Sequence, residues 1–190
     1  FLTYDNVWDA SRLTDLDPNN SNNVLLLYGY NDTDSDVTTD RTRSKDLICS
    51  GISDCTGYWN REHVYPKSLG DPDLGTTGPG SDAQMLRPTD VQRNNDRGSR
   101  LFSEKNAGEF PNGESGNTNG GWYPGDEWKG DCARIIMYMY LRYGDRCLPS
   151  AVGIGSNAST PDDMIDLFLQ WNAEDPVIDG GIEDVRNDYH

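Results

Sequence analysis

Three segments of this chain carry apolar residues in patterns typical of regular secondary structure, and these segments limit the fold more than any other feature of the sequence. The first segment, 24–30, reads VLLLYGY and lies between polar Asn and Asp clusters. A short, bounded apolar run of this kind predicts a buried strand. The other two segments, 127–143 and 161–171, have apolar residues at helical spacing. We therefore expect one hydrophobic core, formed by both strand and helix.

Both predicted helices carry end signals. The helix over 127–143 has its stop at Gly144. The helix over 161–171 has Pro161 at its first position, and Asp163 completes a capping-box pattern with Thr160. Apolar stripes run along both helices, at Cys132, Ile135, Ile136, Met139 and Tyr143, and at Met164, Leu167, Phe168 and Trp171. Such stripes face a core far more often than a cofactor, so we assign them to the core.

Length and composition narrow the class of protein. A chain of 190 residues fits one domain, and five Trp, ten Tyr and four Phe argue against disorder. A net charge of −16 argues against a generic nucleic-acid coat protein, which needs a basic surface. No apolar run approaches the roughly 18–20 residues of a membrane span, so we expect a soluble protein. With no repeat and no linker, the sequence predicts a single α+β domain over 1–190 with long loops.

The cysteines suggest an oxidising environment. Cys49, Cys55, Cys132 and Cys147 match no zinc motif in their spacing, and the chain has only two histidines. Of the three possible pairings, Cys49–Cys55 with Cys132–Cys147 is the simplest, and four reduced core thiols are the alternative. A first residue of Phe1 instead of Met favours a processed, mature form. We therefore expect a secreted protein.

One histidine lies in a segment suited to chemistry. His63 follows Glu62 in the run NREHVYPKS, whereas His190 is the last residue. Imidazole exchanges a proton near neutral pH, and a carboxylate is a hard oxygen ligand for Mg²⁺ or a similar ion. Adjacent side chains on a regular strand point to opposite faces, so both serve one site only where the backbone is irregular. A lone Glu-His pair is usually a surface pair.

A second motif follows about 25 residues later, in LRPTDVQRNNDRG. Thr89 is expected to cap a two-turn helix that ends at Gly98. Asn94 and Arg97 then lie on one side of that helix. An amide oxygen is a neutral metal ligand, and a guanidinium suits a phosphate oxygen. A base, two oxygen ligands and a phosphate-binding group together fit metal-assisted phosphodiester hydrolysis.

The charge distribution is compatible with this assignment. Residues 61–105 contain seven basic and seven acidic residues, so the other 145 residues carry the whole charge of −16. A polyanionic substrate would meet a locally neutral surface on an acidic body. Four basic residues of this region are expected to contact phosphate: Arg61, Lys67, Arg87 and Arg93.

The two motifs together resemble the bacterial endonuclease I family, which consists of periplasmic or secreted non-specific nucleases of the ββα-metal (His-Me finger) class. The specific part of the resemblance covers 58–102, within a looser match over the whole chain. The resemblance implies a ββα-metal core at about 57–102. It also implies cleavage of single- and double-stranded DNA, with RNA as a further substrate, that leaves 5′-phosphate ends. We expect a monomer located outside the cell or in the periplasm.

The resemblance also implies roles for individual residues. His63 would be the general base, and Glu62 and Asn94 would hold one Mg²⁺, with Mn²⁺ or Ca²⁺ as alternatives. Arg97 would hold the phosphate or product. The chain departs from the family where Ala83-Gln84-Met85 replaces a usual His-containing pair. Asp82 and Gln84 are expected to support the ligands without touching the ion. The chain is also expected to stop before an Asn/Arg/Pro-containing tail seen in many relatives, through trimming or as a genuine difference.

Two other interpretations stay open. Asp-rich segments at 32–40, 71–82 and 175–188 allow an acidic, extracellular, Ca²⁺-dependent binding module without catalysis, although none matches the EF-hand loop pattern. A ribonuclease with little activity on DNA differs only in its substrate. For the nuclease, the acidic body predicts salt tolerance and a saline habitat, because salt screens repulsion between the protein and nucleic acid.

Overall fold

The computed structural model describes residues 2–160 and 162–189 as one α+β unit with long loops. The helices are α1 (Asn6–Thr14), α2 (Val91–Arg97), α3 (Lys129–Tyr143), α4 (Asp166–Glu174) and α5 (Ile182–Tyr189). The strands are β1 (Leu16–Asp17), β2 (Asn20–Leu25), β3 (Thr42–Ser44), β4 (Trp59–His63), β5 (Leu86–Asp90), β6 (Gly116–Asn117) and β7 (Trp122–Tyr123). Among the described residues, no helix is both long and apolar enough to cross a membrane.

The strands form three small antiparallel sheets, in the orders β1-β2-β3, β4-β5 and β6-β7. The first two sheets are joined by a hydrogen bond from Leu27 N–H to the carbonyl oxygen of Pro88 in β5 (2.8 Å). Pro88 has no N–H of its own to donate. The predicted strand over 24–30 is therefore displaced: β2 ends at Leu25, and residues 26–29 continue as buried, irregular backbone that contacts β5.

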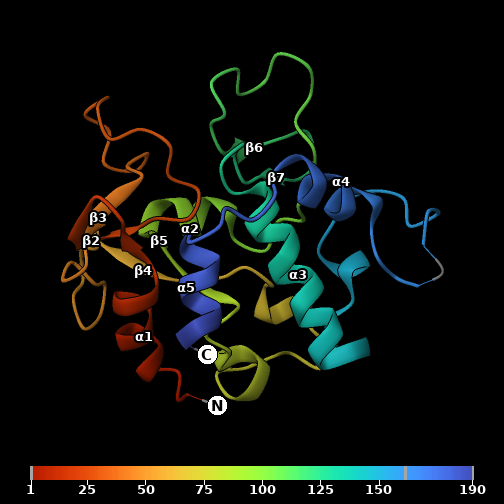
Figure 1. Cartoon of the computed structure of the whole chain (residues 1–190), viewed down its shortest axis with the longest axis horizontal. Helices are drawn as coiled ribbons and strands as arrows, with labels where there is room; N and C mark the ends of the chain where they lie inside the picture. Colours follow the sequence, from red (N-terminus) through yellow and green to blue (C-terminus); the bar gives the residue numbers. More distant parts are fainter. Residues whose placement is uncertain (1, 161, 190) are drawn as a thin grey trace.

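Helix α3 lies at the centre of the core, and its apolar stripe is buried as predicted, with Tyr143 only partly so. Gly144 ends α3 with φ of +56°, a backbone conformation that glycine adopts without strain. Helix α4 packs against α3 and contributes the buried side chains of Leu167, Phe168 and Trp171. Figure 1 shows α5 between the β1–β3 sheet and α3.

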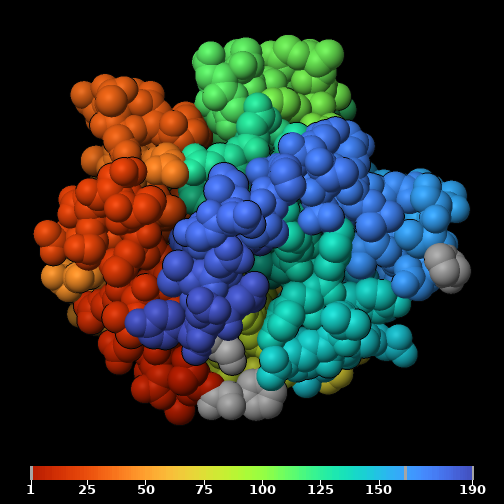
Figure 2. All heavy atoms as spheres, viewed as in Figure 1, coloured from red at the N-terminus to blue at the C-terminus, as the bar shows by residue number. Residues whose placement is uncertain are grey.

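The start of α4 differs from the prediction. The helix begins at Asp166 instead of 161, and no side chain caps it. Asp163 accepts a hydrogen bond from Ser150 N–H (2.8 Å), so it stabilises a loop and completes no capping box. The predicted role of Pro161 lies outside the described residues. Figure 2 shows two loop regions, near residues 31–40 and 106–120, that stand apart at the top of the molecule.

The predicted disulfide between Cys132 and Cys147 is wrong. Both side chains are free and buried, whereas Cys49 and Cys55 are bonded as predicted. Cys132 lies in the first turn of α3 and Cys147 follows its last turn. A helix rises about 1.5 Å per residue, so the eleven steps from Cys132 to Tyr143 alone span about 16 Å. That length far exceeds the Cα separation of about 6 Å that a disulfide allows.

Candidate functional site

The two sequence motifs come together as β4, β5 and α2. Strands β4 and β5 pair in register from Trp59 opposite Asp90 to His63 opposite Leu86. Helix α2 follows β5 directly and contacts both strands. Its cap is Asp90, whose Oδ1 accepts hydrogen bonds from the second and third N–H groups of the helix (2.8 and 3.1 Å). Thr89, the predicted cap, instead donates its hydroxyl to Leu27 O (2.7 Å).

Glu62 lies on the inner face of β4, with only 2% of its surface exposed. Its Oε1 accepts a hydrogen bond from the Tyr28 hydroxyl (2.9 Å) and lies 3.2 Å from Arg97 Nη1. Burial raises the pKa of Glu62 to about 7, although Arg97 and Tyr28 both favour the charged form. The site thus contains a buried carboxylate that is held by one cation and one hydroxyl.

Arg97 connects this carboxylate to the end of β4. Its guanidinium, 1% exposed, donates to the carbonyl oxygens of His63 (3.1 Å) and Val64 (3.0 Å). It also lies over the Phe102 ring, 4.7 Å from its centroid. Arg97 therefore holds the backbone beside the catalytic candidate. Its expected contact with phosphate stays a prediction.

His63, the last residue of β4, is half-buried and faces away from Glu62. Its Nε2 lies 3.0 Å from the carbonyl oxygen of Gly80. A carbonyl only accepts, so in this contact Nε2 carries the proton and Nδ1 is left with a lone pair. Burial lowers the pKa of His63 to about 4, and nearby positive charges, including Lys67, add to that effect. The ring is therefore neutral at pH 7 and able to accept a proton.

Tyr4 from the N-terminal segment packs beside His63. The two rings are stacked, with centroids 5.5 Å apart. The Arg61 guanidinium lies over the same Tyr4 ring (3.6 Å) and over Trp8 (4.1 Å). Lys67 Nζ is 6.0 Å from the Tyr4 centroid. Arg61 and Lys67 are thus brought close to His63, and their expected phosphate contacts stay predictions.

Asn94 lies on α2, facing β4. Its Nδ2 donates to Asn60 Oδ1 at 2.7 Å and lies 3.5 Å from Arg61 O. One position earlier, the guanidinium of Arg93 donates to Ser115 O (2.6 Å). The same guanidinium lies between the rings of Tyr30 and Trp122. Arg93 is therefore held against Ser115 and the two rings, and its phosphate contact stays a prediction.

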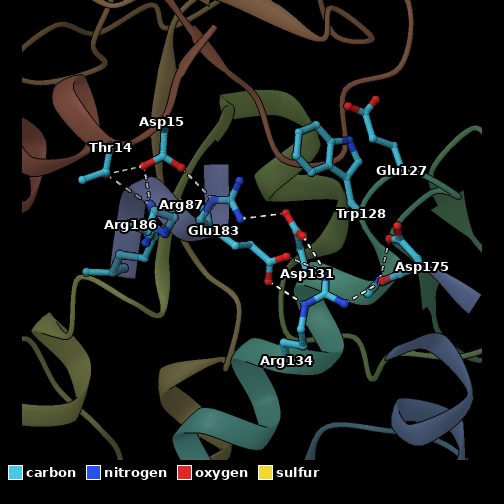
Figure 3. Close-up of polar contacts among 12 residues, drawn as sticks. Thr14, Asp15, Arg87, Glu127, Trp128, Asp131, Arg134, Asp175, Glu183 and Arg186 are labelled. Carbon is cyan, nitrogen blue, oxygen red and sulfur yellow. Dashed lines mark hydrogen bonds and ion pairs between the residues drawn. The ribbon is translucent and has the colours of Figure 1, made fainter. Parts of the chain in front are cut away.

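Arg87 does not reach a surface where phosphate could bind. It is 1% exposed, and it lies in a buried network of charges (Figure 3). Its Nε donates to Asp15 (2.7 Å) and its Nη1 donates to Asp131 (3.1 Å). Asp15 also pairs with Arg186 from α5. This placement contradicts the expected phosphate contact, because both ionic partners of Arg87 belong to the core.

Asp82 and Gln84 support the turn that carries Gly80. Asp82 Oδ2 accepts hydrogen bonds from the hydroxyls of Tyr138 (2.9 Å) and Tyr143 (2.5 Å) on α3. Its Oδ1 accepts from Gln84 N–H (2.9 Å). Gln84 Nε2 reaches α5, 3.4 Å from Arg186 O. Both residues thus act at a distance from Glu62, by fixing the loop between β4 and β5.

Sequence reasoning missed four residues of this site: Tyr4, Tyr28, Asn60 and Gly80. Three of them contact their partners across 17 to 59 positions of sequence, so no local pattern could indicate them. Asn60 lies within the NREH run, and its place two residues before Glu62 on one face of the strand was a usable signal.

Comparison with known proteins adds independent information. The family model for endonuclease I matches residues 2–189. An extracellular ribonuclease of Bacillus subtilis (strain 168) is 40% identical over 189 residues, which cover 94% of this chain and 58% of that protein. An extracellular ribonuclease of Bacillus amyloliquefaciens is 38% identical over 182 residues, covering 93% of this chain and 57% of that protein. The chain thus spans less than two thirds of the length of these relatives.

Proposed function

The chain belongs to the endonuclease I family of nucleases, and from this membership we propose that it is a secreted, divalent-metal-dependent endonuclease with little sequence preference. The observation that carries the proposal is the juxtaposition at the end of β4. There a neutral His63 is held by Gly80, and Arg97 contacts both the His63 backbone and the Glu62 carboxylate. This β4-β5-α2 arrangement supports the ββα-metal core at about 57–102.

The donor chemistry fits a hard divalent ion. Glu62 would provide a carboxylate oxygen and Asn94 an amide oxygen, the ligand types that Mg²⁺ prefers and Mn²⁺ or Ca²⁺ accept. Within residues 2–160 and 162–189, no three His, Cys, Asp or Glu side chains cluster as a metal site. Glu62 and Asn94 are therefore the two side chains that would hold the ion. When bound, the ion would stabilise negative charge on the phosphate as a Lewis acid.

His63 would act as the general base. Its Nδ1 would take a proton from the water that attacks phosphorus, while the Nε2–H donates to Gly80 O throughout. Because the ring is neutral at pH 7, no prior deprotonation is needed. Attack by water and departure of the 3′-oxygen would leave 5′-phosphate ends. Arg61 and Lys67, on the His63 side of β4, would bind neighbouring phosphates.

The names of the two Bacillus relatives support a proposal for the substrate and the location of this protein. Both are named extracellular ribonucleases, which supports RNA as a substrate and export from the cytoplasm. The Cys49–Cys55 disulfide agrees with an oxidising compartment, outside the cell or in the periplasm. The proposed water attack does not involve a 2′-hydroxyl, so single- and double-stranded DNA should be cleaved as well. We propose that the active unit is a monomer.

The test uses supercoiled plasmid and a 5′-labelled RNA, each incubated with Mg²⁺ or with EDTA. Both should be cut only with the metal, and all products should carry 5′-phosphates. His63→Ala should abolish cleavage, whereas His190→Ala, which changes the only other histidine, should not. RNA products that end in 2′,3′-cyclic phosphate, or cleavage that persists in EDTA, would contradict the proposed mechanism.

A further inference from the structure

The side chain of Asn60 makes a direct contact with a proposed metal ligand. Asn94 Nδ2 donates to Asn60 Oδ1 at 2.7 Å, and the same nitrogen lies 3.5 Å from the carbonyl oxygen of Arg61. Both acceptors belong to β4, and the donor belongs to α2. Because both neighbouring atoms are oxygen acceptors, the end of the Asn94 amide that faces them must be the NH₂ group. The opposite assignment would place the amide oxygen against two other oxygens.

This contact fixes where the other end of the amide points. In a planar amide, the oxygen lies across the carbon from the nitrogen, so Asn94 Oδ1 is directed away from both acceptors. Among the described residues, Asn94 Oδ1 accepts no hydrogen bond from another side chain or backbone group. Arg97 lies one turn further along the same side of α2 and reaches Glu62. Asn94 and the buried Glu62 thus lie on the same side of α2, and the amide oxygen is the free end of the Asn94 side chain there.

We propose that Asn60 is a positioning residue for the metal site: its carbonyl oxygen binds the Asn94 amide nitrogen and so turns the Asn94 oxygen toward the ion. This inference rests on the proposed function, because it takes Glu62 and Asn94 as ligands. Groups that orient metal ligands in this way typically affect metal affinity by 10- to 100-fold. Asn60 itself need not touch the ion or the substrate.

Direct Mn²⁺ binding tests the inference without using activity. Titration of the protein with Mn²⁺ alone, followed by the EPR signal of the free ion, gives the Kd of each variant. Asn60→Ala should weaken binding by about 10-fold or more. Asn60→Asp keeps an oxygen that accepts from Asn94 and should bind at least as tightly as the native protein. The control is Asn95→Ala, an exposed neighbour on α2, which should leave Kd unchanged.

A second measurement separates positioning from a general structural effect. In a background of Asn94→Ala, the change Asn60→Ala should have no further effect on the residual Kd, since the group that it orients is gone. A Kd for Asn60→Ala within twofold of the native value would overturn the inference, as would equally weak binding by Asn60→Asp. If the native protein binds no Mn²⁺, or if Asn94→Ala leaves its Kd unchanged, the proposed metal site itself fails.

Discussion

The imidazole Nε2 of His63 lies 3.0 Å from the carbonyl oxygen of Gly80, a residue in the loop between the two strands of the candidate site. A Cβ atom on Gly80 would lie 2.1 Å from Gly75 O, so no larger residue fits without moving this turn. Asp82 anchors this loop, because its carboxylate accepts hydrogen bonds from two tyrosine hydroxyls of α3. The orientation of the candidate base therefore depends on a close backbone contact and on the helix at the centre of the core.

Gly80→Ala should consequently reduce kcat while it changes KM much less. A displaced turn would release the Nε2–H of His63, and misplacement of a reacting group by about 1 Å can cost up to about 100-fold in rate. Steady-state kinetics on a short oligonucleotide would measure the changes in kcat and KM separately. A circular-dichroism melt of the same variant shows whether the fold survives, and an unchanged kcat in a folded variant would contradict the role of Gly80.

The buried charges around Arg87 should make Asp15 essential to stability. Asp15 has no exposed surface and binds both Arg87 and Arg186, so Asp15→Ala leaves two buried guanidinium groups without this partner. Removing one partner from a buried pair costs about 3–5 kcal/mol. Urea unfolding measures the loss. Asp9→Ala is the control, because it breaks a surface ion pair with Arg12. The Asp9 side chain is 75% exposed. That change should cost less than about 1 kcal/mol.

Thiol titration should count two free cysteines in each chain. Unfolded without reductant, the protein should release two equivalents with Ellman's reagent, since only Cys49 and Cys55 are bonded. In the native state both thiols should react slowly, because they are buried and because burial raises the pKa of Cys147 to about 11 and that of Cys132 well above its ordinary value. A count of zero in the unfolded protein would indicate a second disulfide.

Cys147 should also reduce stability at alkaline pH. Its pKa is about 11 in the folded protein against an ordinary value near 9, so the unfolded chain loses this proton first as pH rises. Stability should therefore fall between pH 9 and 11, with a contribution from this thiol of up to about 1.4 kcal/mol per pH unit. Urea unfolding across this range, compared with Cys147→Ala, isolates the contribution. An identical pH slope in the variant would refute it.

Nuclease activity should rise with added NaCl before it falls. Outside residues 61–105 the chain carries a net charge of −16, which repels nucleic acid at low ionic strength. Salt screens this repulsion over a Debye length of about 10 Å at 0.1 M, whereas at high salt the few phosphate contacts weaken in turn. Initial rates on plasmid from 10 mM to 2 M NaCl test this. A steady decline from the lowest concentration would contradict the prediction.

The sequence was sufficient to predict the elements that are marked by a local pattern of apolar residues. Helix α3 was predicted to within two residues of its start and at its end, because its stripe is regular and Gly144 stops it. The same reasoning missed α5, whose only buried residue is Arg186, among acidic neighbours. A helix anchored by a charged side chain has no apolar stripe, so its composition looked like that of a solvated loop.

The candidate site was predicted in part, for a similar reason. Glu62, His63 and Asn94 stood out because their side-chain types suit the chemistry. Residues that orient them contribute an aromatic ring, an amide or a backbone carbonyl, none of which is distinctive in sequence. Cys132 and Cys147 illustrate the opposite error, because their pairing was inferred from spacing although the helix predicted between them already held them apart.

Pro88 has a consequence for how the protein behaves at high concentration. The N–H and C=O groups of one strand residue point to the same side, and the carbonyl oxygen of Pro88 points away from β4 to accept from Leu27. The outer edge of β5 therefore offers no donor at this residue, and its acceptor there is already occupied. A strand from another molecule therefore cannot pair with β5 at this residue, which disfavours edge-to-edge association along that side of the hairpin that carries the candidate site.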